Sequence, residues 1–330
     1  MENKKKITIS QSAASVITAF VGVVILMVVF SFMNPNFIKP DSIMALLRSI
    51  VPYLLVGIGQ AYVCITGNID LSIGSVLGMS AMISATMMCK GFNPLVAILV
   101  AFVCCMAVGF VNGVLVGKFK LPPFIATLGT MTIARGVAQL ANNNYNTDNI
   151  GSEGAAQAFK DLLYYGKTMG VFNGVWIALI IWAIFFYILS YTRSGRHIYA
   201  IGSNVDAARL SGVNVFAATT KAYMVSSFCA FLTGLVTLAQ SGMGDMSAGM
   251  SYEMYAVAAA VIGGVSTLGG SGLLVGVIAG AAVWAILQSG LTFAKVPVAY
   301  RNIVIGILVV ACVLFDVIRR NGSKRPKSKG

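Results

Sequence analysis

Long apolar stretches, separated by short polar connections, follow one another along almost the whole chain. A helix needs about 20 mainly apolar residues to cross the hydrocarbon layer of a membrane, and ten segments approach or reach that length. Only 10% of the residues are charged, whereas a soluble domain carries about a quarter, so too few polar residues remain to cover a large soluble core. The sequence therefore predicts an all-α integral membrane protein of about ten transmembrane helices, some of them broken. The predicted crossings are residues 13–33, 43–66, 69–89, 94–117, 122–140, 174–193, 216–240, 252–268, 272–292 and 299–318.

The positions of the basic residues predict how these helices are oriented. Basic residues gather at both ends of the chain and in the connections 118–121 and 193–215. Cytoplasmic connections of membrane proteins carry an excess of Lys and Arg. An even number of crossings puts both termini on one side, so we expect both in the cytoplasm and the long connection 141–173 outside. The predicted domains are a cytoplasmic tail over 1–12, a transmembrane domain over 13–318 and a basic cytoplasmic tail over 319–330.

Two apolar stretches are interrupted. Residues 49–89 carry Asp70 as their only charge, within the sequence Asn68-Ile69-Asp70, and residues 254–294 carry no charge but contain two Gly-Gly pairs. Each stretch is long enough for two crossings joined by a tight turn, or for broken helices at membrane depth. Non-helical backbone is tolerated there only if it is buried in protein or lines a cavity. Glycines at four-residue spacing predict close helix packing; they are Gly109, Gly113 and Gly117, then Gly272, Gly276 and Gly280.

Several functional classes are excluded by what the sequence lacks. There is no GxxxxGK[ST] phosphate-binding loop, so the chain cannot hydrolyse ATP alone. The single histidine, His197, has no companion at metal-ligand spacing, and no catalytic set of residues can be assembled. The net charge of +13 is not arranged with aromatic residues on one soluble face, so no nucleic-acid partner is expected. The six cysteines lie in or beside apolar stretches and are interpreted as small buried hydrophobes.

Polar residues inside the predicted crossings are candidates for a solute path, because such residues are unfavourable in lipid. Most of them are neutral amides and hydroxyls, which suit an uncharged, hydroxyl-rich solute better than an ion. Each of them could equally form a hydrogen bond between helices. Asp70 could line the path, cap the following helix or pair with an arginine such as Arg135. The candidate translocation path consists of Asn68, Asp70, Asn112, Thr127, Gln240 and Gln288.

Four passages carry a resemblance to a known family. They are TGNIDLSIGS at 66–75, PFIATLGT at 123–130, GRHIYAIGSN at 195–204 continuing as AARLSGV at 207–213, and AAVIGG at 259–264. In this order they resemble the permease subunits of the ribose, galactoside and xylose group of bacterial ABC sugar importers. Two departures are visible: Asn68 stands where the family often has Gly, and Gly-Ser-Asn at 202–204 stands where it has Gly-Gly-Asn.

The resemblance implies a multi-pass subunit in the bacterial inner membrane that forms the path for a monosaccharide. It also implies the partners, namely a cytoplasmic ABC ATPase that binds the ATP and Mg, an extracytoplasmic solute-binding protein and a second permease subunit. This chain itself would bind no cofactor or metal and would not be an enzyme. Import of a branched-chain amino acid, a nucleoside or a furanone signal stays open. A secondary carrier is disfavoured, because such carriers usually contain several carboxylates in their crossings.

The connection 193–215 is the predicted contact with the ATPase. It combines glycines, expected in turns, with a short helix over 205–210 that Asn204 would cap. The residues alone leave a solvated loop equally open, and the resemblance favours a lever that transmits ATPase movement. The outer connection 141–173 is expected to dock the binding protein. The candidate coupling residues are Gly195, Arg196, Gly202, Asn204, Ala208, Arg209 and Gly212.

Overall fold

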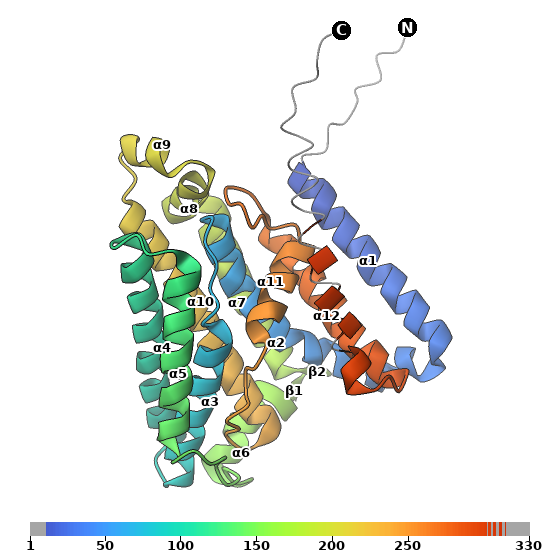
Figure 1. Cartoon of the computed structure of the whole chain (residues 1–330). Coiled ribbons are helices and arrows are strands. Elements are labelled where there is room, and N and C mark those ends of the chain that lie inside the picture. Colours follow the sequence, from blue (N-terminus) through green and yellow to red (C-terminus); the bar gives the residue numbers. More distant parts are fainter. Residues whose placement is uncertain (1–10, 302, 305, 308–309, 312–313, 315–330) are drawn as a thin grey trace, which may run out of the picture.

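The computed structural model describes residues 11–301, 303–304, 306–307, 310–311 and 314. In this part of the chain the long helices stand side by side as a bundle (Figure 1), and the prediction of an all-α membrane protein is confirmed. Within these residues, seven helices are long and apolar enough to cross a membrane, and two apolar helices are shorter. The seven are α1 Gln11–Met33, α2 Pro40–Ile65, α4 Pro94–Gly117, α5 Pro123–Ala141, α7 Asn173–Tyr191, α10 Val215–Ser241 and α12 Leu274–Phe293; the shorter two are α3 Ile73–Cys89 and α11 Tyr252–Ile262.

Short elements connect these helices. A 3-10 helix, η1 Pro35–Ile38, precedes α2, and two helices, α8 Arg193–Ser203 and α9 Val205–Leu210, follow α7. The connection between α5 and α7 contains α6 Gly154–Lys160, η2 Asp161–Tyr165, β1 Lys167–Thr168 and β2 Val171–Phe172. The two strands pair antiparallel, with Lys167 opposite Phe172.

Most of the predicted crossings agree with the helices to within a few residues. The exceptions are the interrupted stretches, where α3 begins at Ile73 instead of residue 69 and α11 ends at Ile262 instead of residue 268. Residues 1–10 and the predicted tail 319–330 lie outside the described residues, as do several residues of the tenth predicted crossing, 299–318. The count of ten crossings therefore stays a prediction.

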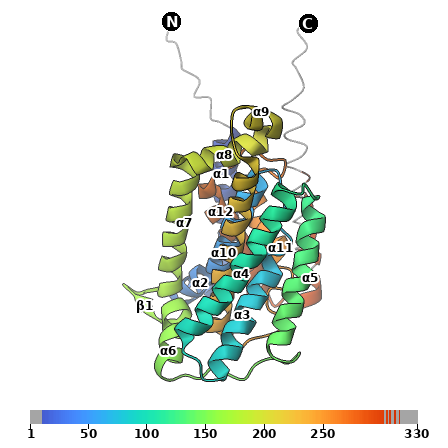
Figure 2. The ribbon, with the colours of Figure 1, turned by 90° about the vertical axis from the view of Figure 1, so that its left-hand side faces the viewer.

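The bundle has two distinct ends. The helices α8 and α9 form one end, and α6 lies at the other (Figure 2). We refer to them as the α9 end and the α6 end. Both figures show the start of α1 on the α9 side of the bundle, where Ser15 is the nearest neighbour of Gly264. Successive long helices then alternate in direction, as expected of a chain that crosses a membrane repeatedly.

Two non-helical segments penetrate the bundle from opposite ends. The first non-helical segment (residues 66–72) leaves α2 at the α9 end and leads into α3 (Figure 1). The second (residues 242–251) leaves α10 at the α6 end, where Thr147 binds Gly244, and leads into α11. The second segment meets the first turn of α3 inside the bundle, because Gly74 lies directly against the carbonyl oxygen of Gly249. The stretch 49–89 is thus a pair of helices joined by non-helical backbone inside the bundle, whereas the stretch 254–294 contains α11 and α12, which residues 263–273 join at the α9 end.

The helix α10 forms the centre of the bundle and packs against α2, α3 and α4. Its contact with α4 is close because α4 presents glycines there. A Cβ atom on Gly109 would lie 2.9 Å from the carbonyl oxygen of Tyr223, and one on Gly113 would lie 2.6 Å from the Cα of Thr220. In α12, Gly276 and Gly280 contact the backbone of Gly263 and Ala259, so the predicted glycine faces are confirmed there. Gly272 precedes the helix and has a φ of 147°.

Of the six cysteines, Cys312 lies outside the described residues. The interpretation is confirmed for three of the other five and wrong for one. Cys64, Cys105 and Cys229 are buried, and Cys104 is half-buried. Cys89, the last residue of α3, is exposed. Its thiol donates a hydrogen bond to the carbonyl oxygen of Asp148 at 3.3 Å, so it lies at the α6 end beside the connection 141–173.

The glycine contact between α4 and α10 can be tested by substitution. We expect Gly113→Val to destabilise the protein by about 1–3 kcal/mol, because overpacking forces backbones apart. The measurement is the thermal unfolding midpoint of the detergent-solubilised protein. Gly129→Val is the matched control, since a Cβ at Gly129 would have no neighbour within 4 Å. Equal midpoints for the two variants would contradict the packing described here.

Candidate functional site

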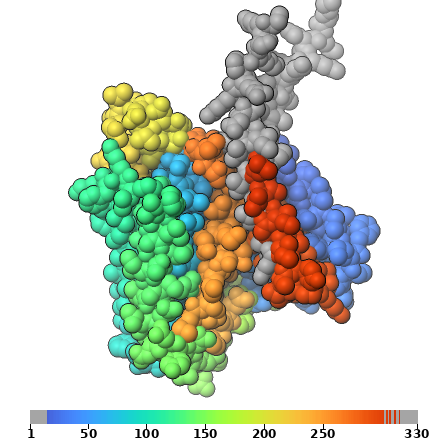
Figure 3. All heavy atoms as spheres, in the orientation of Figure 1, coloured from blue at the N-terminus to red at the C-terminus, as the bar shows by residue number. Residues whose placement is uncertain are grey.

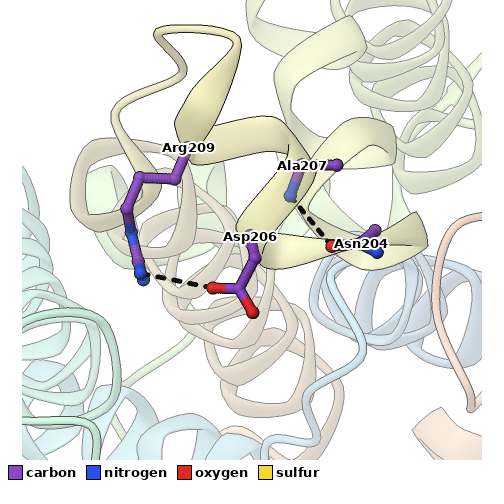
Figure 4. A network of polar contacts seen from close by, with 4 residues as sticks. All are labelled: Asn204, Asp206, Ala207 and Arg209. Carbon is purple, nitrogen blue, oxygen red and sulfur yellow. Dashed lines mark hydrogen bonds and ion pairs between the residues drawn. The ribbon is translucent and has the colours of Figure 1, made fainter.

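The segment predicted to couple to a partner folds as two consecutive helices. Thr192 caps α8, with its hydroxyl accepting from the backbone N–H of Gly195 at 3.4 Å. Asn204 caps α9, with its Oδ1 accepting from the N–H of Ala207 at 2.9 Å (Figure 4). The predicted helix 205–210 and its cap are therefore confirmed. The exposed ion pair of Asp206 and Arg209, 3.3 Å apart, contributes little to stability.

The expectation that Gly195 and Gly202 form turns is wrong, because both lie within α8. Only Gly212, which follows α9, adopts the left-handed backbone of a turn, with a φ of 81°. The sequence signal for α8 was present but missed. It consists of a capping threonine and of Ile198 and Ile201, three residues apart on one helix face and 1% and 2% exposed.

The end of α8 contacts the end of α2 and the connection between α11 and α12. Gly202 lies directly against the carbonyl oxygen of Ile65, the last residue of α2. That same oxygen accepts a hydrogen bond from the N–H of Gly270 at 2.8 Å. A Cβ on Gly269 would lie 2.7 Å from the carbonyl oxygen of Gly202 and 2.9 Å from the Cα of Gly67. We call this meeting of Gly67, Gly202, Gly269 and Gly270 the glycine junction.

Tyr199 adds a side-chain link from α8 to the same region. Its hydroxyl donates to the carbonyl oxygen of Gly272 at 2.7 Å. Burial raises the pKa of Tyr199 to about 12, so the phenol keeps its proton and remains a donor at neutral pH. A displacement of α8 must therefore act on the connection 66–72 and on the connection between α11 and α12 together.

The exposed side of α9 differs from the side that the sequence suggested. Ala208 is only 5% exposed and packs with Ile201 and Ala218, so it holds α9 onto the bundle. Leu210, 90% exposed, and Val205, 41% exposed, point outward instead. Two exposed apolar side chains on a six-residue helix offer an apolar contact to another protein. They were not predicted from the sequence, because the candidates were chosen from the motif and not by the face of the helix on which they lie.

Beside α9 lies a cavity of about 1060 Å³ at the α9 end of the bundle. Its walls come from residues 66–68, the end of α4, α9 and the start of α10. Lys118, Lys120 and Arg209 line it, together with Asp206 and the predicted path residue Asn68. Arg196 lies on an exposed position of α8, outside the residues that line this cavity.

Three of the predicted path residues take part in one buried polar network. Ser72 donates its hydroxyl to Asp70 at 2.6 Å and accepts from the side-chain amide of Asn112 at 3.0 Å. The single hydroxyl proton of Thr130 is shared between the side-chain oxygen of Asn112 at 2.7 Å and the carbonyl oxygen of Thr127 at 3.2 Å. Asp70, Asn112 and Thr127 are all 0% exposed. The network ties the entry of α3 to α4 and α5.

Asp70 also reaches α10, since Ser226 donates to its second oxygen at 2.7 Å. Its first oxygen accepts from the backbone N–H of Ser72 at 2.9 Å, which fixes the entry into α3. Among the described residues the only ion pair is Asp206 with Arg209. Hydroxyl and amide donors therefore surround Asp70, and Arg135 is not its partner. Instead, Arg135 donates to the carbonyl oxygens of Met246 and Ala248 at 3.0 and 2.8 Å.

The remaining path candidates take no part in this network and lie in three different places. Asn68 binds Thr66 through its side-chain amide at 2.7 Å, at the α9 end. Gln240 is exposed near the end of α10, where its carbonyl oxygen accepts from Tyr165 at 2.9 Å. Gln288 lines a separate cavity of about 370 Å³ between α2 and α12. The structure does not bring the six residues together into one path. Within the described residues, no group of three or more His, Cys, Asp or Glu could hold a metal ion.

The environment of Asp70 gives a test of its role. We expect Asp70→Asn to destabilise the protein by about 1–3 kcal/mol, because an amide group offers a donor where Ser72 or Ser226 also donates. The unfolding midpoint of the purified protein measures the effect, and Asp148→Asn, at an exposed position, is the control. An Asp70→Asn protein with unchanged stability and impaired transport would instead identify Asp70 as part of the path.

Most of the chain is similar to known proteins. A family model described as the permease component of a branched-chain amino acid transport system matches residues 42–313. The ribose import permease protein RbsC of Bacillus subtilis is 34% identical over 297 residues, which cover 90% of this chain and 91% of that protein. The autoinducer 2 import system permease protein LsrC of Escherichia coli is 32% identical, covering 91% and 86%. The D-allose transport system permease protein AlsC of Escherichia coli is 32% identical, covering 88% of each. No solved structure matches the chain.

Proposed function

Since the chain belongs to the family of permease components of transport systems, we propose that it is the membrane-spanning subunit of an ABC importer for a monosaccharide. Its relatives are transport components rather than enzymes. The observation that carries the proposal is the glycine junction. At this junction α8, which projects with α9 from one end of the bundle, contacts the end of α2 and the connection between α11 and α12.

Charge supports a cytoplasmic position for the α9 end. Five basic residues and one acidic residue lie in the connections there, whereas the other end is balanced between the two signs. Cytoplasmic connections are the ones enriched in Lys and Arg. At the α9 end the residues are Lys118, Lys120, Arg193, Arg196, Arg209 and Asp206; at the α6 end they are Lys39, Lys90, Lys160, Lys167 and Lys295 with Asp41, Asp148, Glu153, Asp161 and Asp245.

In this orientation α9 faces the compartment that contains ATP. A partner ATPase, which holds the ATP and Mg, docks on the exposed face of α9 formed by Val205 and Leu210. Its closure displaces α8, and the glycine junction passes the displacement to residues 66–72 and to the connection after α11. The short helices and strands of residues 141–173 face outward and receive the solute-binding protein. A second permease subunit completes the path, and the assembly resides in the bacterial inner membrane.

The solute follows from the relatives and from the chemistry of the bundle. Their names specify ribose, autoinducer 2 and D-allose, whereas the family description refers to branched-chain amino acids. The polar groups buried within the bundle are mostly hydroxyls and amides. Such groups can hydrogen-bond a hydroxyl-rich solute without having to stabilise a charge. A monosaccharide is therefore the solute class that we assign.

The energy source of transport provides the direct test. Cells that express the chain with its neighbouring ATPase and binding protein are offered labelled D-ribose, D-allose or L-leucine. We expect uptake of a sugar that stops on ATP depletion and persists when the proton gradient is collapsed. Uptake that follows the proton gradient would assign the chain to the secondary carriers, and uptake of L-leucine alone would replace the solute class.

The docking face of α9 gives a second test. We expect Leu210→Asp to abolish co-purification of the ATPase, because a charge would replace an apolar side chain that is 90% exposed. Met169→Asp is the matched control, since Met169 is also 90% exposed but lies in the turn between β1 and β2 at the opposite end. Retention of the ATPase by the Leu210→Asp protein would remove α9 as the docking face.

A further inference from the structure

A second large cavity lies within the depth of the bundle, away from the α9 end. It has a volume of about 590 Å³ and is bordered by α3, α5, the second non-helical segment and the start of α11. With a rise of about 1.5 Å per residue, Arg135 lies about 18 Å along α5 from the α9 end and about 9 Å from the opposite end of the helix. The polar residues lining the cavity are Ser75, Thr132, Arg135, Gln139, Ser251 and Glu253.

The cavity lies at the starts of α3 and α11, the two helices that follow the non-helical segments. Ser75 belongs to the first turn of α3 and Glu253 to the first turn of α11. These turns touch, because a Cβ on Gly74 would lie 2.6 Å from a carboxylate oxygen of Glu253. The starts of interrupted helices at membrane depth expose free N–H groups and positive dipole ends, and solute sites form there. Non-helical backbone at membrane depth is tolerated where it lines a cavity, and the segment 242–251 lines this one.

The guanidinium of Arg135 is held in place by backbone carbonyls, and it forms no ion pair with the carboxylate of Glu253. One guanidinium nitrogen of Arg135 donates to the carbonyl oxygens of both Met246 and Ala248, which anchors the side chain to the second non-helical segment. The described part of the chain contains no ion pair between Arg135 and Glu253. Both side chains are half-buried. A fixed donor group and a carboxylate acceptor thus line one cavity from two different elements.

We propose that this cavity is the solute site of the permease and that it binds one neutral monosaccharide, an inference that rests on the proposed function. Its volume falls within the range of about 300–1,000 Å³ of small-molecule sites. The carboxylate accepts from sugar hydroxyls, the guanidinium donates to them, and hydroxyl and amide side chains do both. Met131, Met246 and Met250 add apolar contacts for the faces of the sugar ring.

The alternative occupant is a zwitterionic amino acid, which Arg135 and Glu253 could bind through their charges. The other polar residues of the cavity favour the sugar. Ser75, Thr132, Gln139 and Ser251 add neutral hydrogen-bonding groups that sugar hydroxyls can use. The methionines would contact a branched-chain side chain as well as a sugar ring, so the solute that is transported distinguishes the two occupants.

The position of the cavity suits solute that arrives from outside. It lies nearer to the α6 end, which faces the binding protein in the proposed orientation. In Figure 3 the green surface of α5 borders the orange surface of residues 242–262 on the face toward the viewer, and no other described element of this chain covers that boundary. The six path residues predicted from the sequence do not line this cavity. Asp70, Asn112 and Thr127 belong instead to the buried polar network.

The test measures both sugar uptake and ATPase activity in the complete transporter. We expect Glu253→Gln to lower the maximal rate of D-ribose or D-allose uptake about tenfold and Thr132→Val about threefold, as the loss of a charged and of a neutral hydrogen bond implies. ATPase activity stimulated by the binding protein should stay within about twofold of wild type, because the glycine junction is untouched. That second readout separates a lost solute site from a misfolded or unassembled permease.

Thr237→Val is the matched control. The hydroxyls of Thr132 and Thr237 both donate to the carbonyl oxygen four residues earlier, at 3.1 and 2.9 Å, but only Thr132 lines the cavity. Normal sugar uptake by both cavity variants overturns the site while the proposed function stands. Uptake of L-leucine in place of sugar by the wild type overturns the solute class. A wild-type complex that transports none of the three solutes overturns the proposed function and the site together.

Discussion

The need to satisfy backbone polar groups inside a membrane determines how this structure is organised. Two segments, 66–72 and 242–251, are not helical although they lie among crossing helices. Lipid offers no hydrogen bonds to such backbone, so protein groups must supply them. Arg135 does this for the carbonyl oxygens of Met246 and Ala248. Asp70 does it for the N–H of Ser72. The few charged side chains within the bundle are thus placed where the helices are broken.

The connections after α2 and after α11 explain how a movement at one end of the molecule can reach its centre. An unbroken helix ends in a connection that can move independently of the helix interior. Here the end of α2 and the connection after α11 share one carbonyl oxygen, that of Ile65, which lies against Gly202 and accepts from Gly270. The buried network of Asp70, Ser72, Asn112 and Thr130 then links the entry of α3 to three neighbouring helices. The contacts are continuous from α8 to the depth of the second cavity.

The sequence predicted the helices well because hydrophobicity and length are local properties. It also identified Asn204 as a cap and residues 68–70 as an interruption. It did not predict that Gly202 would lie inside a helix, because glycine favours turns in general and only the close approach of Ile65 explains it here. It grouped Asp70 with Gln240 and Gln288 as polar residues in crossings, although they lie in different parts of the fold. Arg135 and Glu253, 118 positions apart in the sequence, come together only through the second non-helical segment.

The contact between Gly74 and Gly249 has a consequence for how a passage could open. Main chain touches main chain there, and the structure leaves no room for even one carbon atom between them. A barrier made of side chains can open when a single rotamer changes. A barrier made of backbone has no rotamers, so it opens only when whole helix ends separate. Gly74 and Gly249 can therefore separate only if backbone moves, through a displacement of the start of α3 relative to residues 242–251, and a change of side-chain rotamer leaves their contact unchanged.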